Sequence, residues 1–196
     1  PESPSARVSL TLAGGRVNPE VEPLDRLAGT TSYILGRDHA RWRTGVPQYG
    51  RVRYREVYPG IDVVFRSAGR ELEYDFVVAP GADPSQIRLR FSGADSLRID
   101  EQGALRLTAG GTEIHQPKPL VYQQTDAGRV TIAGDYRLGR GGEVRFRLGD
   151  YDRSLPLVID PVLVCAGYFG GDKYDVITGM AFDHDGSLWL TGTTQS

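Results

Sequence analysis

The sequence contains a single cysteine, Cys165, so no disulfide can form within the chain. An exported protein can fold without disulfides when its core is large enough, so the compartment stays open on this ground. The residues just before Cys165, 162–164, are apolar. We therefore expect a buried, unreactive thiol.

Long apolar runs are also missing. No run approaches the ~18 residues that a membrane-spanning helix needs, and no apolar core of a signal peptide follows the polar first residues. We therefore expect no membrane insertion in this segment, and any export signal to lie upstream of it. The formal net charge of −2 predicts no strong attraction to nucleic acid.

A sustained helical period is absent as well. Apolar and polar residues alternate instead, which places one class of residue on each face of a half-buried strand. Glycine-rich turn signals interrupt these runs about every ten residues, as in a sandwich or barrel. The sequence thus predicts an all-β, antiparallel β-sandwich-like domain. Alternation is clearest in residues 51–55, 71–76, 87–91, 105–107 and 144–148.

The chain divides at Asp160-Pro161, where its composition changes. We expect an all-β domain over residues 1–161 and a different unit over residues 162–196. Residues 1–32 give the weakest pattern: residues 8–12 predict a strand, residues 18–28 a connecting loop, and the abrupt polar start suggests a missing upstream piece.

The second unit has the pattern of a β-hairpin. Two strand-like runs, residues 177–183 and 187–193, flank the turn signal Asp185-Gly186. Such a hairpin opens a propeller blade, and a blade alone leaves its edges unpaired. We expect residues 162–169 to add a strand to the upstream sheet, and the hairpin after Asp172 to be the less stable part.

Short motifs in both units resemble known bacterial families. Residues 168–194 resemble one SBBP-type β-propeller repeat. Upstream motifs resemble the domain of unknown function that precedes such repeats in bacterial surface proteins. The repeat-like motifs are YFGG at 168–171, Asp175, FD at 182–183, DG at 185–186 and LTGTT at 190–194. The upstream motifs are WRTGVP at 42–47, VYPGID at 57–62, LEYDFVV at 72–78, PGADP at 80–84 and YDRSLPLVIDP at 151–161.

The resemblance implies export, a place outside the cell or on its surface, and further propeller blades downstream as partners within the same polypeptide. It implies no activity. We therefore expect a non-catalytic structural or adhesive module, with a glycan or a protein at the cell surface as a further partner.

One set of carboxylates suggests an alternative. Glu71, Glu73 and Asp75 alternate along one strand and lie about 7 Å apart, a separation within the range of inverting glycosidases. The alternative is therefore a carbohydrate-binding or carbohydrate-active domain that uses this face. Pairing with arginines on neighbouring strands, such as Arg66, is the structural interpretation that we favour. Aromatic candidates for a glycan face are Tyr122, Tyr136 and Tyr151.

No other pattern predicts a catalytic, metal or cofactor site. The three histidines, His39, His115 and His184, are scattered, and no zinc or nucleophile motif is present. The run from Asp183 to Gly186 begins like a calcium loop but lacks the later ligands of one. Weak calcium binding is left open at Asp172, Asp175, Asp183 and Asp185. Trp42, between Arg41 and Arg43, is expected to pack into the core rather than to stack on a nucleic acid base.

Overall fold

The computed structural model describes residues 8–34, 36, 38–68, 71–161, 175–182 and 188–194. Strands in antiparallel sheets make up this part of the chain, with three short 3-10 turns and no α-helix, so the all-β prediction is confirmed. The described residues contain no helix long and apolar enough to cross a membrane.

The largest sheet has seven strands in the order β11-β10-β14-β5-β4-β3-β2. Its N-terminal members, β2 to β5, form a meander of antiparallel neighbours. The strand β14, although last in this domain, lies in the sheet interior between β10 and β5. The strands are β2 (Val21–Tyr33), β3 (Arg43–Tyr58), β4 (Ile61–Ala68), β5 (Glu71–Val78), β10 (Leu120–Thr125), β11 (Gly128–Ile132) and β14 (Leu157–Asp160).

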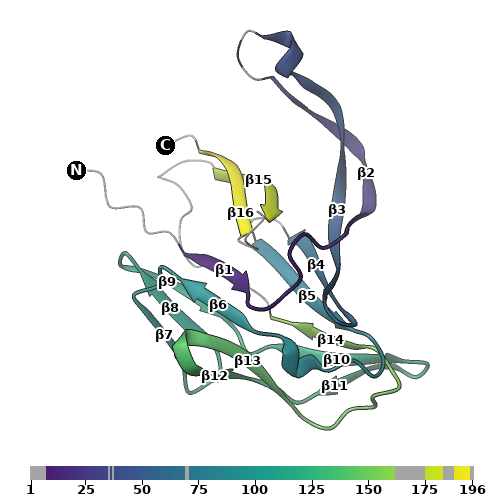
Figure 1. Cartoon of the computed structure of the whole chain (residues 1–196), viewed down its shortest axis with the longest axis vertical. Coiled ribbons are helices and arrows are strands. Elements are labelled where there is room, and N and C mark those ends of the chain that lie inside the picture. The colour runs from purple at the N-terminus through teal and green to yellow at the C-terminus, as the bar shows by residue number, and fades with distance from the viewer. Residues whose placement is uncertain are drawn as a thin grey trace.

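Two smaller sheets complete the domain (Figure 1). One has the order β1-β6-β13-β12 and the other the order β7-β8-β9. Their strands are β1 (Ser9–Leu12), β6 (Leu89–Ser92), β7 (Ser96–Ile99), β8 (Leu105–Ala109), β9 (Thr112–Gln116), β12 (Gly134–Leu138) and β13 (Glu143–Leu148). A 3-10 turn over Pro84–Gln86 follows β5, and Asp83 caps it by accepting a hydrogen bond from the Ser85 amide.

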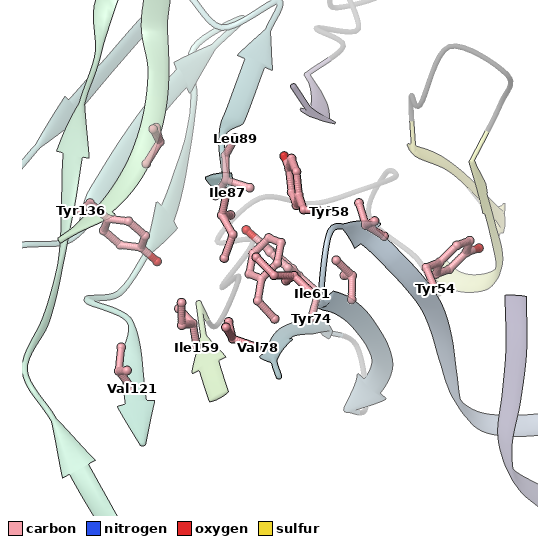
Figure 2. Packing of buried hydrophobic residues seen from close by; sticks show 14 of the residues in the cluster. Tyr54, Tyr58, Ile61, Tyr74, Val78, Ile87, Leu89, Val121, Tyr136 and Ile159 are labelled. Carbon is pink, nitrogen blue, oxygen red and sulfur yellow. The ribbon is translucent and has the colours of Figure 1, made fainter. Parts of the chain in front are cut away.

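One apolar core joins the three sheets, because each sheet turns the apolar residues of its alternation toward the others. Figure 2 shows Tyr136 and Val121 on one side of this cluster, Tyr54 on the other, and Ile61 and Tyr74 between them. Rings also connect the sheets: Phe76 of β5 meets Phe146 of β13 with centroids 5.8 Å apart.

A tight turn joins β3 and β4, and the register of the pair shifts between Tyr54 and Tyr58. Tyr58 pairs with Ile61 across Pro59 and Gly60, the residue order that a type II turn favours. Gly60 has a φ of 70°, and a Cβ atom there would lie 2.8 Å from the Cβ of Ala82. Only glycine therefore fits this corner without displacing the loop that packs on it.

The strands β2 and β3 continue past the sheet as a two-stranded arm (Figure 1). Arg51 is the first β3 residue paired with β4, so among the described strands residues 43–50 pair only with β2. A 3-10 turn over His39–Arg41 lies at the tip. We call residues 26–50 the arm.

The expected loop over residues 18–28 is wrong, because β2 begins at Val21. Proline and two acidic residues interrupt the alternation by which a strand is recognised in the sequence. As an edge strand, β2 tolerates Pro23, which cannot donate a ladder hydrogen bond. Glu22 accepts hydrogen bonds from Arg53 and Arg55 of β3. Cross-strand ion pairs, rather than alternating apolar residues, thus stabilise the pairing of β2 with β3.

The expected core position of Trp42 is also wrong, because this residue lies at the tip of the arm. Its ring stacks on His39 with centroids 3.9 Å apart, and its indole N–H donates to the Gly36 carbonyl at 3.2 Å. Strand alternation does not apply here, because Trp42 ends the 3-10 turn and precedes β3.

A separate hairpin follows at the C-terminal end. Strands β15 (Asp175–Phe182) and β16 (Leu188–Thr194) pair in antiparallel register, as the hairpin prediction requires. The predicted added strand over residues 162–169 and Cys165 lie outside the described residues.

Candidate functional site

Glu73 and Asp75 of β5 lie on the face of the seven-stranded sheet that is turned away from the core. Tyr74 and Phe76 point into the core, so Glu73 and Asp75, which alternate with them, occupy the opposite face. Glu71 begins the same strand, and its backbone pairs with Ala68.

Arg66 of β4 binds two of these acidic residues. It pairs directly across from Glu73, its Nε donates to Glu73 Oε2, and its Nη1 donates to Asp75 Oδ2. Pairing with Arg66, the structural interpretation of this face, is thereby confirmed for Glu73 and Asp75.

A third carboxylate comes from the far end of the domain. Arg66 Nη2 donates to Asp160 Oδ2 at 3.2 Å. The register pairs Ile159 with Phe76, so Asp160, the last residue of β14, lies beside Asp75. We call Arg66, Glu73, Asp75 and Asp160 the Arg66 cluster.

Asp160 was not predicted as a member of this cluster, because Asp160-Pro161 was interpreted only as a domain boundary. A signal was present, since Asp160 follows the buried Ile159 and alternation puts it on the outer face. The missing information was the pairing of β14 with β5. Their paired positions Ile159 and Phe76 lie far apart in the sequence, so no local pattern links them.

Burial and like charge set the electrostatics of the cluster. Burial raises the pKa of Asp75 to about 6, and the charge of Asp160 beside it acts in the same direction, while Arg66 opposes both. For Arg66, burial acts to lower the pKa, but the hydrogen bond to Glu73 and the three carboxylates more than offset it, so its pKa is raised. The guanidinium therefore stays charged.

Two carboxylate oxygens of the cluster have no hydrogen bond within the described part of the chain. These are Asp75 Oδ1 and Asp160 Oδ1, both buried. Protonation of Asp75 would let it donate to Asp160, which is a further cause of its raised pKa. One arginine and three ionised carboxylates leave a net charge of −2, so the arrangement favours keeping one proton.

The cluster gives little access to a substrate. The side chains of Glu73, Asp75 and Asp160 are only 17%, 10% and 11% exposed. Each also accepts a hydrogen bond from Arg66. An inverting glycosidase needs two carboxylates that reach a sugar and a water molecule from opposite sides. Carboxylates held by a shared arginine in a nearly closed face do not meet this requirement.

Two surface hollows lie away from the cluster. One, of about 300 Å³, is lined by Gly14, Gly15, Arg16, Glu56, Val57 and Pro59. The other, of about 310 Å³, lies where Phe146 and Tyr151 meet Asp83, Asp150 and Arg153. No residue of the Arg66 cluster lines either hollow.

The three candidate tyrosines do not share a face. Tyr136 is buried in the core. Tyr122 lies half-buried on the outer face of the seven-stranded sheet, with the Arg129 guanidinium carbon 3.9 Å from its ring centroid. Tyr151 lines the second hollow. They therefore do not form one aromatic platform for a sugar.

The calcium candidates lie almost wholly outside the described residues. This is so for Asp172, Asp183 and Asp185, while Asp175 begins β15 and pairs through its backbone with Thr194. Within the described ranges, no group of three or more His, Cys, Asp or Glu side chains is placed to hold a metal ion.

A second buried polar contact holds the residue after Asp160. The side-chain amide of Gln116, fully buried at the end of β9, donates to the Tyr74 hydroxyl and to the Pro161 carbonyl, both at 3.0 Å. This contact was not predicted, because an isolated glutamine at the end of a strand carries no recognisable signal in the sequence. Asp160 and Pro161 are thus held by side chains from two different sheets.

Comparison with known proteins gives one match. The model of the family described as "Domain of unknown function (DUF7948)" matches residues 2–162. No curated protein and no solved structure matches this chain. Since the match covers most of the sequence, the chain belongs to the DUF7948 family.

Proposed function

We propose that this protein is a non-catalytic structural module of an exported bacterial surface protein, and that it holds the first blade of an SBBP-type β-propeller. Residues 162–196 would supply the start of that blade. The resemblance of residues 168–194 to such a repeat and the observed pairing of β15 with β16 support this proposal.

The observation that carries the proposal is the double attachment of the domain's last residues. Arg66 binds Asp160 from β4, and Gln116 binds Pro161 from β9. Each contact is made by a side chain far away in sequence, so the direction in which the chain leaves β14 depends on the folded domain. A module that positions a downstream unit requires such a fixed exit.

The carbohydrate alternative is less well supported by the same geometry. Its proposed face consists of Glu71, Glu73 and Asp75. Two of these carboxylates, Glu73 and Asp75, accept hydrogen bonds from Arg66 instead of facing an open surface. The aromatic candidates also lie apart from one another.

Hydrogen exchange on the full chain tests the proposal. Arg66→Met removes three charge-assisted hydrogen bonds, and Gln116→Leu leaves the Tyr74 hydroxyl and the Pro161 carbonyl without their donor. We expect faster backbone exchange in β14 and in β15–β16 for both variants. Arg137→Met, at an exposed position on β12, is the matched control and should leave both regions unchanged.

A glycan array with the wild type and Glu73→Gln addresses the alternative. The structural proposal expects no signal that depends on Glu73. Unchanged exchange in Arg66→Met and Gln116→Leu, together with glycan binding or cleavage lost in Glu73→Gln, would replace the structural role by the carbohydrate role.

A further inference from the structure

We propose that the tip of the arm binds an anionic lipid surface peripherally. The tip comprises Ile34, His39, Trp42 and Arg43. This inference goes beyond the structural role proposed above and does not depend on it.

The arm carries its tip well away from the rest of the domain. Among the described strands, residues 43–50 pair only with β2, and eight residues of strand span roughly 26 Å. Figure 1 shows the arm extending away from the sheets. Described side chains along it are mostly exposed, as expected for a two-stranded ribbon outside a sheet.

Charge separates the arm from the body. The arm contains four arginines and one aspartate, a formal charge of +3, so the chain's total of −2 leaves −5 on the remaining residues. The Debye length at physiological salt is about 8 Å, much shorter than the arm. A planar anionic surface that meets the tip first is therefore attracted to it without strong repulsion from the acidic body.

The tip combines basic and apolar groups. Tyr33 pairs with Arg43, so Ile34 and Trp42 lie across from each other where the ribbon ends. Ile34 is 53% exposed, and Arg43 is exposed beside it. Tryptophan with arginine is typical of the interface between lipid headgroups and acyl chains.

The exposed side chain of Ile34 favours a lipid surface over other polyanions as the ligand of the tip. A nucleic acid or an acidic polysaccharide would use Arg43 and an open aromatic face, but Trp42 already stacks on His39 and donates its N–H to Gly36. Ile34 would contribute little to either polymer, whereas it can enter the headgroup region of a lipid surface.

Vesicle co-sedimentation of the full chain provides the test. The vesicles are phosphatidylcholine alone, or phosphatidylcholine with about one third phosphatidylglycerol, since anionic lipid attracts each nearby arginine by roughly fivefold in affinity. We expect binding only to the anionic vesicles, weakening as salt rises. Arg43→Glu should reduce binding by at least that factor, and Ile34→Ser should reduce it at both low and high salt.

Matched controls use the body of the molecule. Arg137→Glu and Leu138→Ser change an exposed arginine and an exposed leucine on β12, away from the arm, and should bind like the wild type. Thermal unfolding of every variant shows whether it is folded. Equal loss in the control variants, or no binding to the anionic vesicles, would overturn the proposal. Binding to a sulfated polysaccharide or to DNA that exceeds binding to vesicles would also overturn it.

Discussion

At the scale of single residues, Asp75 has the most unusual environment in the described part of the protein. It lies beside Asp160 across two paired strands, where like charges destabilise a sheet. Arg66 offsets this repulsion by donating to both carboxylates. Burial, and after it the charge of Asp160, still raise the pKa of Asp75, so the folded state holds its proton more tightly than the unfolded chain does.

Asp75→Asn should therefore stabilise the protein at alkaline pH. The pKa of Asp75 rises from 3.8 unfolded to about 6 folded, so ionised Asp75 lowers the free energy of unfolding increasingly as the pH rises from about 4 to above 6. An asparagine can accept from Arg66 and donate to Asp160. Urea unfolding measures how much Asp75→Asn raises the free energy of unfolding relative to the wild type. This stabilisation should be roughly 1–3 kcal/mol larger at about pH 8 than at about pH 4.5.

Asp126→Asn, in the exposed turn between β10 and β11, serves as the control for that substitution. It should show no such pH-dependent difference. A gain for Asp75→Asn that is the same at both pH values would contradict a raised pKa at this site.

Sequence reasoning at this scale succeeded where partners are near in the sequence. Arg66 and Glu73 lie on consecutive strands joined by a short connection, so alternation alone brought them together. Asp160 and Gln116 could not be placed in the same way, because their positions depend on which distant strands become neighbours.

At the scale of elements, β12 approaches β10 so closely at Gly134 that a larger residue there would clash. A Cβ atom added to Gly134 would lie 2.3 Å from Val121 Cγ2, and Val121 is itself buried in the core. Gly134→Ala should therefore lower the free energy of unfolding by about 1–3 kcal/mol through overpacking. Chemical denaturation measures this change.

Gly139→Ala is the matched control, because its added Cβ would meet its nearest neighbour at 3.5 Å, an ordinary contact. The double variant Gly134→Ala/Val121→Ala should be more stable than the two single effects predict when added, since the second change removes the clashing methyl group. Strict additivity would contradict the close approach.

Strands with regular alternation of apolar and polar residues were predicted well, and a strand without that alternation was not. Alternation identified β5, β8 and β13, and the turn signals identified the β15–β16 hairpin. The strand β2 was missed because Pro23 and two acidic residues interrupt the expected alternation. The structure adds a further irregularity at this sheet edge, the positive φ of Asp25, 56°. Such irregularities protect an edge strand from pairing with other chains, so they reflect its position rather than an absence of structure.

At the scale of the whole molecule, two groups of carboxylates respond to pH in opposite directions. Hydrogen bonds from arginine, lysine or serine partners lower the pKa values of a larger group, so the stability it contributes is lost as pH falls through the acid range. Asp75 acts in the opposite sense. The lowered group is Asp25, Asp83, Asp100, Asp135, Glu143 and Asp152.

We therefore expect maximum stability at weakly acidic pH, between about 4 and 6, where the larger group is ionised and Asp75 still holds its proton. Thermal unfolding across a pH series measures this optimum. A melting temperature that rises steadily to neutral pH and beyond would contradict it.

The position of β14 also has a mechanical consequence. Hydrogen bonds of antiparallel strands run perpendicular to the strand direction, and β14 has such bonds on both sides, to β10 and β5. A pull on the chain after Pro161, directed along β14, therefore loads both ladders together rather than opening one bond at a time. Tension from a downstream unit would thus be shared by the interior of the sheet instead of peeling away an edge.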